Sequence, residues 1–185
     1  MAAHNTILFL AVPDSLNEEL RHLQEGFAVD SSILLPVELG EGETVLDPEK
    51  LSWEMILSAM IRVVSAPYEE YAADVQPGWI DYYRRFVLAV KPGIYNEFTG
   101  AAIIKAKNGD FDMALEITTA LEGLFPNAPG VLLNKALILE DKADALEKAG
   151  RRDAEETDQK ALEAYNRVLA VEPVLADALF NAGFF

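Results

Sequence analysis

The chain has 185 residues, of which 51% are hydrophobic and 25% charged, a composition typical of a folded protein rather than a disordered one. Its 31 acidic and 15 basic side chains give a net charge of -16, which disfavours nucleic acid and anionic membranes as partners. The absence of cysteine excludes disulfides, thiolate metal sites and cysteine nucleophiles.

Targeting signals are not evident in the sequence. The longest early apolar run, residues 7–12, is too short for a signal-peptide core and follows no Lys or Arg. No run approaches the roughly 18 apolar residues that a membrane helix needs. We therefore expect a cytoplasmic protein that does not span a membrane.

Residues 1–46 form an N-terminal segment of unknown type. Apolar runs at residues 7–12 and 33–39 are compatible with strands. Between them, Ser15 and Glu18 have the spacing of a capping box, which predicts a short amphipathic helix ending near Gly26.

Residues 47–94 carry two helical patterns. Asp47 as N-cap and Pro48 at the first position predict a helix that extends to about Ser65. Pro77 opens a second helix that ends before Pro92. We expect these helices to form a divergent repeat-like unit with a longer connection around residues 67–76.

A periodic pattern follows, in which Pro92, Pro126 and Pro173 each close a helix-like stretch. The first interval is one repeat period of about 34 residues, and the second is that period plus an insertion of about 13 residues. Small residues keep phase with these prolines, which predicts that they are buried where helices touch: Ala102, Ala114, Ala136, Ala161 and Gly183. The turn of the first unit is placed at residues 109–111.

In period, small residues and proline, the stretch from about residue 95 resembles the tetratricopeptide repeat family. Its units are residues 95–128, a lengthened repeat at 129–175 and a partial repeat at 176–185. Lys105 and Thr118 depart from the family pattern, which usually has aromatic residues there. The resemblance implies a mainly α fold, an α-α superhelix of tetratricopeptide-type helical hairpins that follows an irregular, partly β N-terminal segment.

The inserted residues read as continued helix rather than loop. Apolar residues continue the helical stripe as far as Ala149, and Gly150 can cap that helix. Asp144 with Lys148, and Glu156 with Lys160, have the spacing of favourable i,i+4 pairs. Both helices of the second hairpin should therefore project about two turns, roughly 10 Å, beyond the first.

Catalytic signals are weak. The two histidines, His4 and His22, have no plausible nucleophile beside them, and no known nucleotide, hydrolase or metalloprotease motif is present. Carboxylate pairs such as Glu41 with Glu43 lie in a Gly-rich loop, and side chains in such a loop are usually solvated. We expect no enzyme activity, no cofactor and no metal, with chemistry in residues 1–46 as the alternative that a pocket of perturbed carboxylates would favour.

In the tetratricopeptide family, the inner face of the first helices binds peptides. Carried over by position, that face here consists of Thr99, Ile103, Leu133, Asn134, Leu137, Phe180, Asn181 and Phe184. The subclass that clamps a C-terminal carboxylate places basic residues there, but this face has none, which argues against a clamp. Either these apolar residues are covered within the chain, or they bind an apolar peptide or partner helix.

The resemblance therefore implies a protein-interaction scaffold or adaptor for a protein or peptide partner. The alternative is a dedicated chaperone of the secretion-chaperone type, which shields an apolar client segment. The last helical pattern begins near Ala176 and ends with Phe184 and Phe185. That apolar end predicts either further repeats or a homo-oligomer formed through the C-terminal end.

Overall fold

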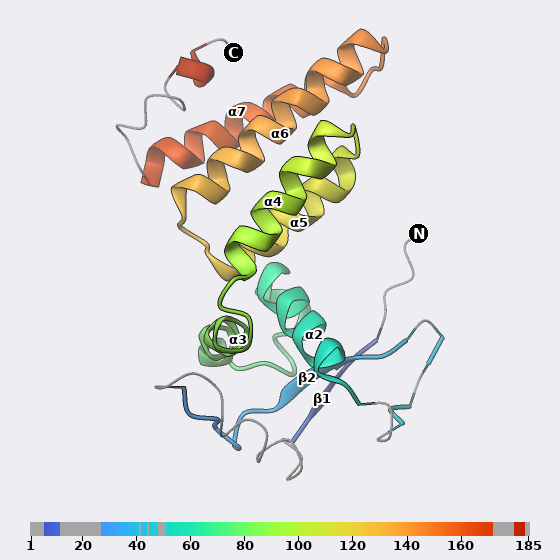
Figure 1. Ribbon diagram of the computed structural model, residues 1–185, viewed down its shortest axis with the longest axis vertical. Helices are drawn as coiled ribbons and strands as arrows, with labels where there is room; N and C mark the ends of the chain where they lie inside the picture. Colours follow the sequence, from blue (N-terminus) through green and yellow to red (C-terminus); the bar gives the residue numbers. More distant parts are fainter. Residues whose placement is uncertain are drawn as a thin grey trace. The chain divides into compact units, whose positions relative to one another are not determined.

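The computed structural model describes residues 6–11, 27–40, 42–43, 45–47, 51–171 and 180–183 (Figure 1). The chain separates into two compact units, Met1–Gly93 and Ile94–Phe185. The described residues are mainly helical and include one two-stranded sheet. The mainly α fold class is therefore confirmed. The division follows residue 93, so residues 47–93 group with the N-terminal segment. We had expected residues 47–94 to belong with the helical repeats.

The first unit is built on a small antiparallel sheet. Strand β1 is Ile7–Leu10 and strand β2 is Leu35–Glu38, with Leu8 opposite Val37. Both lie inside the predicted apolar runs, which confirms the strands. The predicted helix between them falls outside the described residues.

Helix α2, Trp53–Ser65, packs against β2 and against α3, Pro77–Val90, with the short 3-10 helix Tyr68–Glu70 between the two helices in sequence. Helix α3 begins at Pro77 as predicted. Asp47 is not the N-cap of α2. Ser52 holds that position, because its hydroxyl is close enough to accept the Met55 backbone N–H at 3.4 Å.

The second unit contains two helical hairpins. Helix α4, Ile94–Lys107, pairs with α5, Phe111–Leu124, and α6, Pro129–Lys148, pairs with α7, Ala154–Val171 (Figure 1). Helix α6 also packs against α5 and contacts α4. The inserted residues are helical on both sides of the second turn, so the predicted extension of both helices is confirmed.

Candidate functional site

The two hairpins turn in the same way. Gly109 and Gly150 both have positive φ, 79° and 65°, the left-handed conformation that glycine adopts without strain. After α4, the N–H groups of Gly109 and Asp110 donate to the carbonyls of Ala106 and Lys105. After α6, the N–H groups of residues 150 and 151 donate to the carbonyls of residues 147 and 146, which is the same Schellman pattern. The predicted cap at Gly150 is thus confirmed.

Small residues lie at the centre of each hairpin. Ala102 and Ala114 are buried in the first hairpin, and Ala136 and Ala161 are buried in the second, as the repeat period predicts. Gly183 is exposed, so this part of the prediction is wrong. Its neighbour Ala182 packs against the core of the second hairpin instead.

The two residues that depart from the repeat pattern are stabilised locally. The Thr118 side chain is fully buried, and its hydroxyl donates to the backbone carbonyls of Ala114 and Leu115, which lie at 3.1 and 3.0 Å. The Lys105 ammonium pairs with the Asp110 carboxylate at 2.9 Å, across the turn. Neither position therefore needs an aromatic ring for the hairpin to close.

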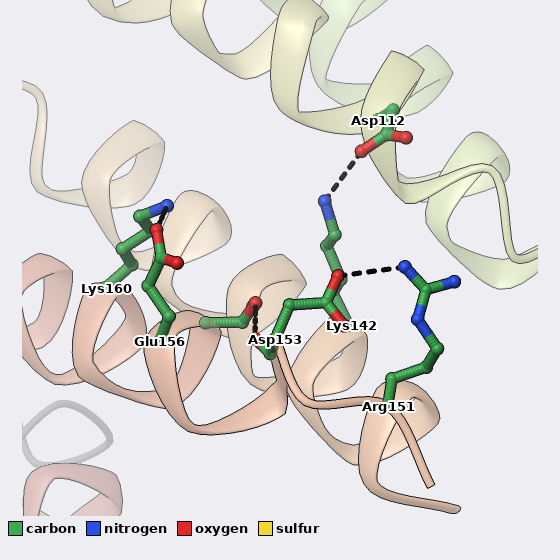
Figure 2. Close-up of polar contacts among 7 residues, drawn as sticks. Asp112, Lys142, Arg151, Asp153, Glu156 and Lys160 are labelled. Carbon is green, nitrogen blue, oxygen red and sulfur yellow. Dashed lines mark hydrogen bonds and ion pairs between the residues drawn. The ribbon is translucent and has the colours of Figure 1, made fainter. Parts of the chain in front are cut away.

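The hairpins are joined by a row of side chains on α6 that faces the first hairpin. Ile138 is only 4% exposed and shares a cluster with Ala102 and Ala114. On the same row, Lys135 donates to Glu122 at 2.7 Å, and Lys142 donates to Asp112 at 2.6 Å (Figure 2). These contacts fix α6 against α5 with apolar packing in the middle and ion pairs at both ends.

Glu122 is the most connected carboxylate of the second unit among the described residues. It accepts from Lys135 on α6 and from Arg167 on α7. Burial raises the pKa of Glu122, but the hydrogen bonds from these two cations outweigh burial and lower it below its ordinary value. Glu122 is therefore ionised at neutral pH and ties three helices together.

The predicted inner-face residues of α4 and α6 form what we call the recognition stripe: Thr99, Ile103, Leu133 and Leu137. Ile103 and Leu137 hold equivalent places in successive hairpins, and both keep a large exposed fraction, 39% and 38%. Leu133 is half-buried against the core of the second hairpin, as is expected if part of this face serves helix packing. Helix packing thus leaves two apolar side chains of the stripe accessible within the chain.

Polar groups at this face are few. The Thr99 hydroxyl is buried and has no hydrogen-bond partner among the described residues, which is unfavourable by about 1–3 kcal/mol. Asn134 is half-buried. No Lys or Arg occupies the four positions of the stripe.

The remaining predicted site residues are near the end of the sequence. Phe180 is 67% exposed, and Phe184 lies outside the described residues. The Asn181 amide donates to the Tyr165 hydroxyl at 3.1 Å, and that hydroxyl donates to the Glu140 carboxylate. Burial, and then the bond to Glu140, raises the pKa of Tyr165, so the hydroxyl stays protonated and joins Asn181 to α6 and α7. The Asn181 amide therefore forms a hydrogen bond within the chain, which the sequence did not indicate.

The lengthened hairpin carries the expected charges. Glu156 and Lys160 pair at 2.6 Å (Figure 2). Asp144 and Lys148 pair at 3.7 Å. Arg151 donates to the Asp153 carboxylate at 3.2 Å just before α7 begins, as Figure 2 shows by a dashed line. These carboxylates form ion pairs on the surface, where such pairs contribute little to stability.

Two observations on the described residues concern metal binding and carboxylate chemistry. No group of three or more His, Asp or Glu side chains is placed there to hold a metal ion. An open depression of about 460 Å³ in the first unit is lined by Glu38, Glu43 and Glu54, with Leu39, Gly40, Met55 and Ser58. Glu43 accepts from the Gly40 N–H at 3.2 Å, and Glu38 pairs with Arg62 at 2.6 Å, so two of these carboxylates have structural partners.

Comparison with known proteins assigns no family. No protein-family model, curated protein or solved structure matches the chain. Within the described residues, no helix is both long and apolar enough to cross a membrane. The geometry of the second unit is therefore the basis on which a function can be proposed.

Proposed function

We propose that the second unit is a pair of tetratricopeptide-type hairpins whose recognition stripe binds an apolar segment of another polypeptide, as in a scaffold or adaptor. The observation that carries the proposal is the paired exposure of Ile103 and Leu137 at equivalent places of α4 and α6. The same helices bury their neighbours Ala102 and Ala136 completely or nearly so, so the exposed face is distinct from the packing face. A surface repeated on successive hairpins suits an extended or helical ligand that contacts both.

The exposed apolar surface of the stripe supplies part of the energy of peptide binding. Fully burying an aliphatic side chain contributes about 1.5–3 kcal/mol, so covering the exposed part of Ile103 and Leu137 contributes roughly 1 kcal/mol each. Together they contribute roughly 2 kcal/mol of the about 8 kcal/mol that micromolar affinity corresponds to, so a ligand of that affinity makes further contacts on the second unit.

The ligand class follows from the side chains present. With no Lys or Arg on the recognition stripe, a free C-terminal carboxylate gains no charged hydrogen bonds there. Asp141, one turn beyond Leu137 on α6, is exposed and negative, whereas Lys107 holds the equivalent place on α4. The preference for basic flanks therefore rests on the charge of the chain as a whole, which is -16. We therefore propose an apolar segment flanked by basic residues, with no requirement for a free C-terminus.

Peptide selection tests this proposal and does not require that the natural partner be identified first. A random peptide library is selected on the chain and counter-selected on the Leu137→Glu variant, which places a charge on the stripe at a position that is already partly exposed. The proposal predicts enriched peptides with apolar cores and Lys or Arg flanks. It also predicts that Leu137→Glu or Ile103→Glu weakens them at least about tenfold in calorimetric titration.

The matched control is Ile104→Glu, which adds the same charge one residue away on a different face of α4. This variant should bind the enriched peptides as the unmodified chain does. Peptides that bind Leu137→Glu equally well, or that bind only as free acids and not as amides, would refute the assignment of the site.

A further inference from the structure

The row of side chains by which α6 packs on the first hairpin has a counterpart on α4. We call these rows packing stripes: Val131, Lys135, Ile138 and Lys142 on α6, and Glu97, Ala101, Ile104 and Asn108 on α4, each one repeat period earlier. On α6 the stripe is in use, since Val131 and Ile138 are buried and both lysines form ion pairs. On α4 the stripe is open, since Ile104 is 62% exposed.

The α4 packing stripe also has a small, uncovered region next to Ile104. A Cβ atom added to Gly100 would meet no other atom within 4 Å, and Ala101 is only half-buried. The exposed face therefore has one large apolar side chain, Ile104, that projects beside a shallow gap at Gly100 and Ala101. Helix packing interdigitates such features.

The charges along this face are arranged with opposite signs at its two ends. Glu97 lies two turns before Ile104, and Lys107 lies one turn after it, on the same side of α4. Both side chains are exposed, and neither forms an ion pair with another described residue; Lys105 nearby is already paired with Asp110. In a second copy of α4 that runs antiparallel to the first, the positive end therefore lies opposite the negative end of the first.

We propose that this face is a homodimer contact in which α4 packs antiparallel against α4 of a second copy of the chain. In that arrangement Ile104 of each copy lies over Gly100 and Ala101 of the other. Glu97 of each copy meets Lys107 of the other, so one symmetric contact makes two ion pairs. The proposal is independent of peptide binding, because the contact is centred on Ile104 and includes no residue of the recognition stripe.

Twofold symmetry favours this occupant. An isologous contact needs a surface that is complementary to itself, and the antiparallel pairing of the α4 packing stripe meets that condition in both size and charge. One helix against its copy is a small interface, so we expect a weak dimer that forms at roughly 10–100 μM. Two chains of charge -16 repel each other, so the measurement is made near 0.15 M salt, where charges more than about 8 Å apart are screened.

Sedimentation equilibrium over a range of concentrations, with circular dichroism of every variant to verify folding, tests the proposal. Ile104→Glu should weaken dimerisation about a hundredfold, because one buried isoleucine is lost from each copy. Glu97→Lys and Lys107→Glu should each weaken it about tenfold, because each places like charges opposite one another twice. The double exchange Glu97→Lys with Lys107→Glu should restore the dimer.

Ile103→Glu is the matched control for the dimer, since it changes the adjacent residue on the recognition stripe. It should leave dimerisation unchanged while it weakens peptide binding, so that the two proposals fail separately. A chain that is monomeric at millimolar concentration would overturn the homodimer proposal. So would a dimer that Ile104→Glu does not affect, or one that the double charge exchange fails to restore.

Discussion

The packing of the two hairpins can be tested at Ala114, where one methyl group fills the space between helices. Ala114 is fully buried and lies in one cluster with Ala102 of α4 and Ile138 of α6. Leucine at this position adds three carbon atoms to a site that three helices enclose. Overpacking of this kind is unfavourable by about 1–3 kcal/mol, because side chains leave their preferred rotamers and the helices move apart.

The assay is urea unfolding followed by two probes. Both tryptophans, Trp53 and Trp79, lie in the first unit, so their fluorescence reports on that unit, whereas far-UV circular dichroism reports on the helices of both units. For Ala114→Leu, we expect the circular dichroism midpoint to fall by roughly 1 M, which follows from about 1–3 kcal/mol and a slope of similar size per molar urea.

The matched control is Ala145→Leu, the same substitution at an exposed position of α6. Surface substitutions usually change the free energy of unfolding by less than about 0.5 kcal/mol, so this variant should unfold with the unmodified chain. An Ala114→Leu variant whose circular dichroism midpoint equals that of the control would refute the close contact of α4, α5 and α6.

Three further predictions concern the second unit. Glu122→Gln should destabilise it by about 1–2 kcal/mol near pH 7, because two cations lose their carboxylate. The pKa of Glu122 is lowered in the folded chain. The difference in free energy of unfolding between the variant and the unmodified chain should therefore be present above the ordinary pKa and disappear as pH falls through the lowered value. Tyr165→Phe should be unfavourable by about 1–2 kcal/mol in thermal unfolding, because Glu140 and Asn181 lose a shared partner. Deleting residues 143–149 together with 151–156 restores the repeat spacing of the first hairpin and should leave a helical, cooperatively unfolding chain; loss of helicity beyond the deleted turns would contradict the view of the insertion as a simple extension.

Much of the second unit could be predicted from residue types at fixed spacing. Ala102, Ala114, Ala136 and Ala161 are buried because close helix contacts tolerate only small side chains, and this requirement is visible in one sequence. Gly150 is predictable for a similar reason, since a left-handed helix end strongly favours glycine.

The misses have two physical causes. Asp47 followed by Pro is a strong local signal for the cap of α2, but Ser52 lies immediately before the helix and can reach its Met55 N–H. Contacts between distant side chains are invisible to periodicity, and the link from Asn181 through Tyr165 to Glu140 is of that kind. The sequence therefore indicates a binding residue at Asn181, whereas its amide has an internal acceptor.

The open packing stripe on α4 is not recognisable from the sequence alone. Ile104 and Ile138 are related by the same repeat period as the buried alanines, so the burial of one and the exposure of the other required the structure. The division of the chain after residue 93 likewise depends on contacts between β2 and α2, which no local pattern in either segment indicates.

The most direct test of the central proposal places a reporter on the recognition stripe. Because the chain contains no cysteine, Leu137→Cys provides a single site for an environment-sensitive fluorophore, and Ile104→Cys provides the control on the neighbouring face. Titration with a peptide enriched by the selection should shift the emission of the label at residue 137 in a saturable way and leave the label at residue 104 unchanged. Equal responses at both positions, or saturable binding with no response at residue 137, would contradict peptide binding at the recognition stripe.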